Sequence, residues 1–185
     1  AGSVGPYGAF LANGAEYRGD YALPDDEMKA FHRPRVQALL AAGADLLACE
    51  TLPSFAEARA LTALLAEFPE AQAWFSFTLR DATHISDGTP LREVAAFLQA
   101  QPQIVALGIN CVALEQATPA LQQLQTLTSK PLVVYPNSGE QYDAASKTWH
   151  SAPSGCTLRD KLPEWRAAGA RLIGGCCRTT PQDIA

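Results

Sequence analysis

Residues 41–46 (AAGADL) and residues 167–172 (AAGARL) share one local pattern. In each, a helix-like stretch ends in two alanines, a glycine follows, and an apolar run begins. Glycine directly after a helix favours a left-handed cap that redirects the chain, and a short apolar run is typical of a buried strand. The two stretches therefore predict a repeated helix-to-strand unit, which decides the fold class.

Apolar runs of this kind recur along the chain. Their starts are 28, 31, 27 and 40 residues apart, the usual size of a strand–helix unit. They show little alternation of apolar and polar residues, as strands buried on both faces of a parallel sheet do. The predicted strands are residues 45–49, 73–79, 104–110, 131–135 and 171–174, and residues 1–5 add the end of a sixth.

Helix-like stretches lie between these runs, at residues 24–42, 54–68, 90–100, 114–127 and 157–168. The alternation predicts one α/β domain over residues 1–185. Parallel units of this type form an open doubly wound sheet or close as an eight-stranded barrel, and the pattern alone leaves both open. Because a barrel needs about two more units, and the chain begins in a strand-like stretch without an initiator methionine, we expect a piece of a larger domain.

Composition excludes several classes of protein. The formal net charge is −5 and no lysine or arginine run forms a basic stripe, so we expect no nucleic-acid partner. No apolar run approaches the roughly 20 residues that span a bilayer, and the first ten residues lack the basic start of a signal peptide. The five cysteines are an odd number and two are adjacent, which disfavours a secreted disulfide framework. We expect a cytoplasmic protein with reduced thiols and no membrane partner.

Three cysteines fall at the carboxyl ends of predicted strands, where α/β proteins build their sites. Cys111 ends GINC (108–111), and Cys176 and Cys177 end GGCC (174–177). Three soft thiolates at one place form a Zn²⁺ site with an open fourth position, and the two glycines let the backbone turn so that both neighbouring sulfurs face one ion. The alternatives are core packing of Cys111 and a strained disulfide between Cys176 and Cys177.

Polar residues at other strand ends have two interpretations each. Glu50 follows the strand 45–49 and either holds an ammonium group of a substrate or caps the next helix. Asn110 and Asn137 either hydrogen-bond a substrate or brace a loop.

Aromatic residues gather in the long loops, where loop packing is their simpler role. The alternative is an aromatic wall that attracts a cationic ligand through cation–π contacts. These residues are Tyr7, Tyr17, Tyr21, Tyr142 and Trp149.

The remaining candidates have structural interpretations. Cys49 lies in an apolar context that predicts a core position, and Cys156 lies in a polar loop. His32 is predicted on the solvent side of a helix. Ser54 followed by Glu57 has the spacing of a capping box at a helix start.

The two cysteine motifs, GINC and GGCC, resemble the zinc-ligand motifs of the homocysteine S-methyltransferases. Residues 49–52 (CETL), 136–140 (PNSGE) and 2–8 (GSVGPYG) resemble further segments of that family. The resemblance covers essentially the whole chain and is closest to the bacterial enzymes that use S-methylmethionine as methyl donor.

This resemblance implies a (β/α)₈ TIM barrel of which the chain supplies about strands 3 to 8, because the family's Asp-Gly-rich N-terminal portion has no counterpart in these residues. It implies that Cys111, Cys176 and Cys177 bind zinc and that Glu50 contacts the homocysteine amino group. Asn110 remains a further substrate-binding candidate from its place at a strand end. The implied activity is methyl transfer from S-methylmethionine, or from S-adenosylmethionine, to homocysteine, giving methionine.

The implied chemistry needs no general base. A homocysteine thiol has a pKa of about 8.5, and binding at an open zinc position removes its proton, after which the sulfur attacks the methyl group of a sulfonium in line. Two rival interpretations stay open. One is a zinc-dependent barrel hydrolase, which needs a general base and usually histidine ligands; the other is an inactive or partner-requiring barrel fragment.

Overall fold

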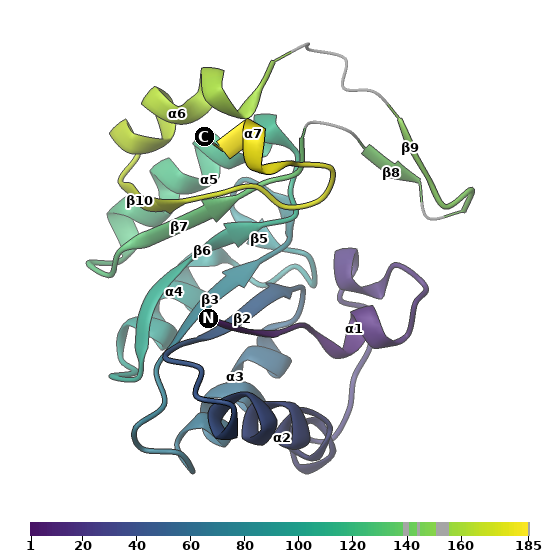
Figure 1. Cartoon of the computed structure of the whole chain (residues 1–185), viewed down its shortest axis with the longest axis vertical. Helices are drawn as coiled ribbons and strands as arrows, with labels where there is room; N and C mark the ends of the chain where they lie inside the picture. Colours follow the sequence, from purple (N-terminus) through teal and green to yellow (C-terminus); the bar gives the residue numbers. More distant parts are fainter. Residues whose placement is uncertain (139–140, 144, 151–155, 185) are drawn as a thin grey trace.

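The computed structural model describes residues 1–138, 141–143, 145–150 and 156–184. Its centre is a sheet of six strands that all run parallel, in the order β1-β2-β3-β6-β7-β10 (Figure 1). This confirms the predicted parallel α/β architecture. The strands are β1 (Gly2–Val4), β2 (Leu47–Leu52), β3 (Ala73–Phe77), β6 (Ile104–Asn110), β7 (Leu132–Tyr135) and β10 (Ala170–Ile173).

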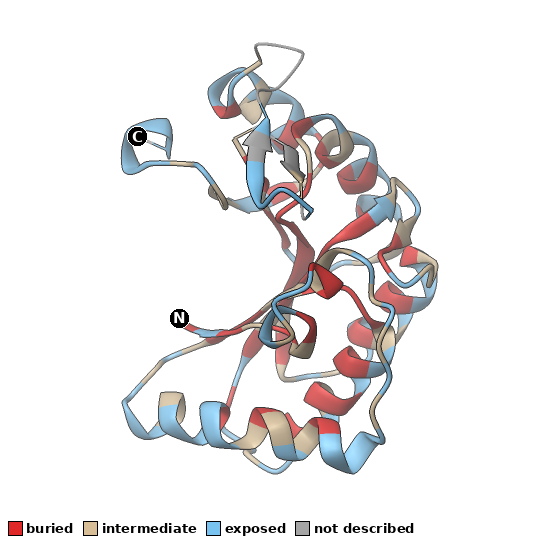
Figure 2. Cartoon of the chain, turned by 90° about the vertical axis from the view of Figure 1, so that its right-hand side faces the viewer, coloured by how far each residue is buried: buried red, intermediate tan, exposed pale blue. Residues whose placement is uncertain are grey.

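Helices connect successive strands, as the sequence predicted. The sheet is curved, and the helices between its strands lie along its convex side (Figure 2). They are α2 (Asp25–Ala41), α3 (Phe55–Leu65), α4 (Leu91–Gln99), α5 (Leu114–Leu127) and α6 (Leu158–Ala167). Within the described ranges, no helix has the length and apolar character needed to cross a membrane.

Several short elements were not predicted, and most of them follow a strand of the main sheet. Short runs of this kind lack the periodicity on which prediction depends. They are α1 (Tyr7–Phe10), the 3₁₀ turn η1 (Ala15–Tyr17), the hairpin β4 (Leu79–Asp81) and β5 (His84–Ile85), the hairpin β8 (Gln141–Asp143) and β9 (Thr148–His150), and α7 (Pro181–Ile184).

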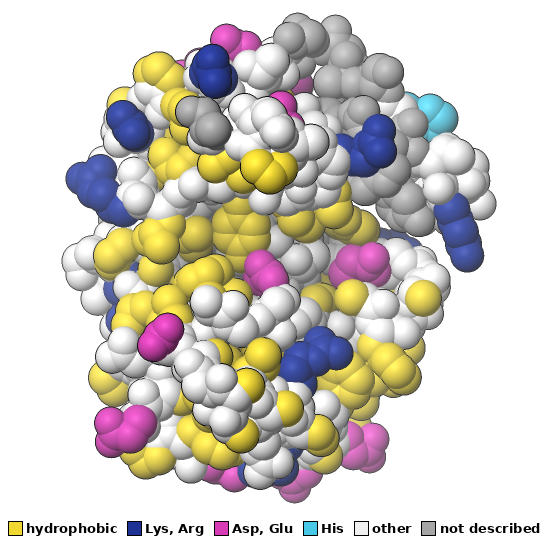
Figure 3. Space-filling view, in the orientation of Figure 1, with side chains coloured by type: hydrophobic (Ala, Val, Ile, Leu, Met, Phe, Trp, Pro, Cys, Tyr) yellow, Lys and Arg dark blue, Asp and Glu magenta, His cyan; other side chains and the backbone are white. Residues whose placement is uncertain are grey.

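The two faces of the sheet differ because successive side chains of a strand point to opposite sides. Cys49 and Phe75 pair in register on the convex side and are fully buried in the core under the helices. Their chain neighbours Glu50 and Ser76 point to the concave side. Figure 3 looks onto that side and shows acidic side chains among hydrophobic ones near its middle. The concave face therefore carries the polar groups of the sheet.

The sheet is open within the described part of the chain. β1 and β10 are its two edges, and neither pairs with the other. The six strands thus form an open, curved parallel sheet, whereas the resemblance implied a barrel of which this chain supplies about strands 3 to 8; a closed barrel is not formed by the described residues.

The prediction for His32 was wrong, because its side chain is buried and not exposed to solvent. Its Nε2 lies 2.7 Å from Oε1 of Glu57, which is itself fully buried on α3. A buried carboxylate is stabilised by a close hydrogen-bonding partner. Only half of the predicted capping box forms: the Ser54 hydroxyl accepts the Glu57 N–H at 3.4 Å, while the Glu57 carboxylate turns toward His32.

Gly108 is required by the close approach of β6 and β7. A Cβ atom at this position would lie 1.7 Å from the backbone oxygen of Val133, so Gly108→Ala forces the two strands apart. We expect a loss of about 3 kcal/mol in the free energy of unfolding, measured by urea denaturation. Gly5→Ala is the matched control, because the nearest neighbour of a Cβ there, the Arg35 guanidinium, is 3.9 Å away. Equal stability of the two variants would contradict the strand geometry.

Candidate metal and substrate site

Three cysteine sulfurs meet at the carboxyl edge of the sheet. Cys111 follows β6, and Cys176 and Cys177 follow β10. The three Sγ atoms lie within 4.8 Å of one another, and those of Cys111 and Cys177 are 3.9 Å apart. Cys111 and Cys176 are joined as a disulfide, so the vicinal pair that the sequence left open, Cys176 with Cys177, is not the bonded one.

Backbone hydrogen bonds hold the three strand ends together. The Cys111 N–H donates to the Tyr135 carbonyl at 3.1 Å and the Cys176 N–H to the Pro136 carbonyl at 2.8 Å. The Ser138 N–H donates to the Cys177 carbonyl at 3.1 Å. The segment after β7 thus lies between the two cysteine segments and links them, which brings sulfurs 65 residues apart in sequence into contact.

The backbone at this edge is strained. Thr51, Cys111 and Arg178 have φ angles of 61°, 51° and 64°, in the left-handed region that residues with a Cβ rarely adopt. Each such residue costs about 1–3 kcal/mol and persists only where its surroundings impose it. Their placement around the thiol cluster marks this edge as the candidate functional site.

One pair of sulfurs, those of Cys111 and Cys177, has the spacing of a tetrahedral thiolate metal site. Zinc–sulfur bonds of about 2.3 Å at tetrahedral angles place neighbouring sulfurs about 3.8 Å apart, close to the 3.9 Å between Cys111 and Cys177. Three thiolates are a donor set that suits zinc. Because a metal needs thiolates, the disulfide between Cys111 and Cys176 must be reduced before the cluster can bind one.

Beside the cluster, the concave face carries a hydrogen-bonded network. The Ser3 hydroxyl donates to Oε1 of Glu50 at 2.5 Å, and the Tyr135 hydroxyl also hydrogen-bonds the Glu50 carboxylate. Trp74 Nε1 donates to the Tyr135 hydroxyl at 3.0 Å, and Ser76 Oγ lies 2.5 Å from it. Burial and the nearby Glu50 charge raise the pKa of Tyr135 well above its usual value, so this hydroxyl stays protonated and donates.

Asn110 has the geometry of a brace. Its Oδ1 accepts the Thr51 N–H at 2.8 Å, and its Nδ2 donates to the Thr51 hydroxyl at 2.7 Å. Nδ2 also lies 3.9 Å from the Cys176 sulfur. These contacts hold Thr51 in its left-handed conformation, and a substrate-binding role for Asn110 stays a prediction.

Two polar atoms after β7 are buried without a partner. They are Oδ1 of Asn137 and Oγ of Ser138, and they lie in the segment that links the cysteine loops. Buried polar groups are normally hydrogen-bonded, so both atoms have free capacity for a bound molecule. Gly139 and Glu140, the rest of that motif, lie outside the described residues.

The other cysteines take the places that the sequence predicted. Cys49 is fully buried in the core, and burial raises the pKa of its thiol. Cys156 is partly exposed just before α6. Neither belongs to the three-sulfur group.

Glu16 is a site residue that the sequence analysis missed, and Tyr17 was named there only as one of five loop aromatics. The Tyr17 side chain hydrogen-bonds the Cys177 thiol. Burial raises the pKa of that thiol, the bond from Tyr17 opposes the rise, and the nearby Glu16 charge raises the pKa further. Tyr17 follows β1 and Cys177 follows β10, so this contact joins segments that leave the two edge strands of the sheet.

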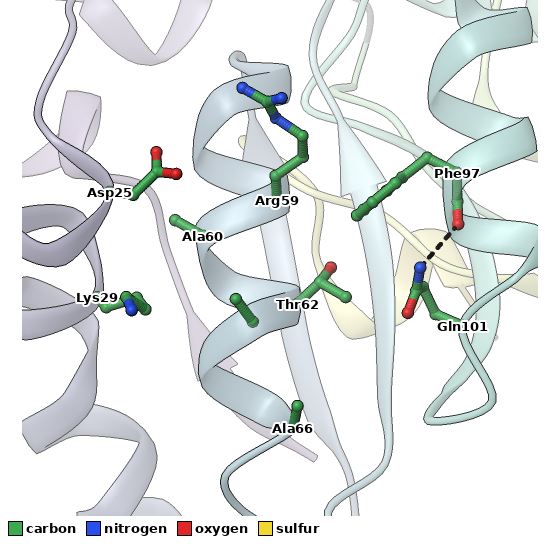
Figure 4. Close-up of a pocket in the computed structure, with 9 residues that line it drawn as sticks. Asp25, Lys29, Arg59, Ala60, Thr62, Ala66, Phe97 and Gln101 are labelled. Carbon is green, nitrogen blue, oxygen red and sulfur yellow. Dashed lines mark hydrogen bonds between the residues drawn. The ribbon is translucent and has the colours of Figure 1, made fainter.

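A separate pocket of about 400 Å³ lies in the helical layer, between α2, α3 and α4. Figure 4 shows the side chains of Asp25, Lys29, Arg59 and Phe97 around it. Its floor is formed by alanines of α3, and no cysteine lines it. It is therefore separate from the thiol cluster at the carboxyl edge of the sheet.

A parallel α/β sheet with clustered thiols and strained backbone at its carboxyl edge defines an α/β domain with a candidate thiolate metal centre. The sequence model of the family "Homocysteine S-methyltransferase" matches residues 1–185. The chain belongs to the homocysteine S-methyltransferase family.

Relatives agree with this assignment. The chain is 69% identical to the homocysteine S-methyltransferase of Escherichia coli over its whole length, and it covers 60% of that protein. It also matches crystal structures of the homocysteine methyltransferase MmuM from E. coli in a metallated form (64% identity, TM-score 0.88) and an oxidized form (65% identity, TM-score 0.88). Each match covers 100% of this chain and 58% of the other. The chain thus spans about 60% of the length of these relatives.

The bracing role of Asn110 can be tested by stability measurements. Asn110→Ala leaves the Thr51 N–H and hydroxyl without their partner, and we expect a loss of about 1–3 kcal/mol in the free energy of unfolding. Adding Thr51→Gly should recover part of this loss, because glycine adopts the left-handed conformation without strain.

Asn13→Ala is the matched control, since Asn13 is exposed and its side chain accepts one N–H, that of Ala15. If Asn110→Ala is as stable as Asn13→Ala, Asn110 is not the brace of this edge.

Proposed function

We propose that this chain carries the metal-binding and substrate-binding half of a homocysteine S-methyltransferase. The reaction is transfer of a methyl group from a sulfonium donor, S-methylmethionine or S-adenosylmethionine, to the homocysteine thiol, giving methionine. The observation that carries the proposal is the convergence of the Cys111, Cys176 and Cys177 sulfurs at one strand edge. Support comes from the names of the relatives, one of which is a metallated form.

Cys111, Cys176 and Cys177 hold the metal, which we propose is Zn²⁺. Zinc with three thiolate ligands supplies an open fourth position whose positive charge ionises a bound thiol at neutral pH. The chain's own contribution is geometric. The segment after β7 ties the two cysteine segments together, so the ligands are assembled once the sheet has folded.

Glu50 accepts the ammonium group of homocysteine. Ser3 and Tyr135 both donate to its carboxylate, which orients it on the concave face near the cysteines. Because these two donors are neutral, the carboxylate keeps its negative charge for an ammonium partner. Asn137 and Ser138, with their unpartnered oxygens, accept further polar hydrogens of the substrate, and Asn110 is the remaining substrate-binding candidate.

The transfer needs no acid or base at the carbon, because the proton of the homocysteine thiol is released to solvent when the thiolate forms. The homocysteine sulfur, as a thiolate, forms a bond to the methyl carbon while the bond from that carbon to the donor sulfur breaks. The leaving sulfur keeps the electron pair of the broken bond and becomes a neutral thioether. The thiolate loses its negative charge and the sulfonium its positive charge, so no proton moves at the carbon.

The six parallel strands are proposed as strands 3 to 8 of a (β/α)₈ barrel domain. Support comes from the curvature of the sheet and from its two unpaired edges within the described residues, β1 and β10. Strands that close the barrel would pair with both edges and cover the concave face. The rival hydrolase has less support, because His32 is bonded to Glu57 and His84 to Asp81, away from the three-sulfur group.

Cys176→Ser should abolish metal binding and methionine formation together, because a hydroxyl is a poor replacement for a soft thiolate ligand. The measurements are zinc content per chain and methionine formed from homocysteine and S-methylmethionine. Cys156→Ser is the matched control and should keep about one zinc per chain. Retention of one zinc by Cys176→Ser would show that Cys176 is not a ligand.

Oxidation and metal binding should exclude each other. In the oxidised chain Cys49, Cys156 and Cys177 are the free thiols, and we expect three reactive thiols under denaturing conditions and no bound zinc. Reduction should give five thiols and about one zinc. Zinc bound at equal stoichiometry by the oxidised chain would place the metal elsewhere.

A further inference from the structure

The segment after β1, residues 7–21, forms a strap across the carboxyl edge of the sheet. Its two ends are fixed to one buried carboxylate, that of Glu57. The Tyr7 N–H donates to Glu57 Oε1 at 2.6 Å and the Tyr21 hydroxyl donates to Oε2, while His32 holds the same carboxylate from α2. Burial and the Glu57 charge raise the pKa of Tyr21, so its hydroxyl remains a donor.

The middle of the strap is fixed beside the thiol cluster. The Thr78 hydroxyl donates to the Glu16 carbonyl at 2.8 Å, and the next residue, Tyr17, contacts Cys177. Gly8, near the start of the strap, packs against this middle part, since a Cβ atom at Gly8 would lie 2.7 Å from the Glu16 backbone nitrogen. These contacts leave little freedom for the position of Glu16.

The Glu16 carboxylate is shielded but incompletely satisfied. Its Oε2 is buried and has no hydrogen-bond partner, and no lysine, arginine or histidine of the described residues forms an ion pair with it. Glu57 shows the contrast, because three donors surround its carboxylate. A shielded carboxylate oxygen without a partner is costly, and a bound cation would remove that cost.

We propose that Glu16 recognises the cationic sulfonium of the methyl donor. The inference rests on the proposed function, in which a sulfonium must lie close to the sulfur cluster. A sulfonium has no N–H or O–H to donate, so it is recognised by charge and by aromatic faces. Glu16 supplies the charge and Tyr17 an aromatic ring. Glu50, with its own donors, is left for the acceptor's ammonium group.

This assignment gives the two carboxylates different kinetic roles. The positive charge that Glu16 recognises is present in the bound donor and disappears during transfer. An interaction that is stronger in the ground state than in the transition state lowers KM without raising kcat. Glu16 therefore selects the charged donor over the neutral thioether product and favours release of that product.

The test compares S-methylmethionine with methionine, which carries the same ammonium and carboxylate groups but no sulfonium charge. Dissociation constants are measured by calorimetry on the reduced, zinc-loaded full chain. The ratio of the two constants isolates the sulfonium charge. We expect Glu16→Gln to reduce this ratio about 10- to 100-fold, from the loss of one close charge interaction in a partly shielded site. Glu16→Asp, which keeps the charge, should restore part of it.

The control Glu27→Gln makes the same charge change on the exposed start of α2 and should leave the ratio unchanged. Zinc content should be the same in all variants, and in steady-state assays Glu16→Gln should raise the donor KM without lowering kcat.

Three outcomes overturn this assignment while the proposed function stands. If Glu16→Gln weakens both ligands equally, Glu16 binds an ammonium group. If it loses zinc, Glu16 supports the metal. If wild type prefers S-methylmethionine and Glu16→Gln keeps that preference, only this inference fails. Absence of both homocysteine-dependent methyl transfer and S-methylmethionine binding in wild type would instead overturn the proposed function and this inference with it.

Discussion

The parallel direction of all six strands is the constraint on which the site depends. Parallel strands end at the same edge of a sheet, so residues that follow β2, β6, β7 and β10 meet there although they are far apart in sequence. Local turns alone cannot bring Cys111 to Cys177, and a change of register in any strand between them would separate the sulfurs. The core on the convex side, built around residues such as Phe75 and Leu121, fixes that register. Packing of apolar side chains on one face therefore determines the geometry of polar chemistry at the edge.

Residues at the site have strained backbone conformations, which the surrounding sheet holds in place. Thr51 and Cys111 occupy left-handed conformations, and Asn110 connects them, since it is the chain neighbour of Cys111 and hydrogen-bonds both polar groups of Thr51. The backbone after β2 and the backbone after β6 are thus coupled through one buried amide. Such a junction is rigid, because neither residue can relax without loss of the two hydrogen bonds. A metal ligand on rigid backbone is held near its bound position before the ion arrives.

Much of this arrangement could be predicted from the sequence, and the failures have physical reasons. The strands and main helices follow from apolar periodicity and from glycine after helices, and GINC and GGCC marked the cysteine cluster. The prediction for His32 failed because helical periodicity identifies the buried face of a helix from its apolar residues, and histidine is polar. The partner that His32 meets in the interior, Glu57, is 25 positions away in sequence. Glu16 escaped notice, and Tyr17 was named only together with the other loop aromatics, because a strap of irregular backbone has no period. Their position depends on Thr78 and Glu57, which no local pattern connects to them.

Three carboxylates near the carboxyl edge of the sheet, those of Glu57, Glu50 and Glu16, link the fold to the chemistry. Glu57 is satisfied by three donors and acts within the structure, Glu50 is oriented by two neutral hydroxyls, and Glu16 keeps one oxygen without a partner. These carboxylates differ in how completely the chain itself satisfies them, and that difference decides their roles. A carboxylate with a full set of protein donors stabilises the fold. One with neutral donors is oriented but keeps its charge for an ammonium group. One that is shielded and incompletely satisfied gains most from a cation that needs no hydrogen bond, which is the chemistry of a sulfonium.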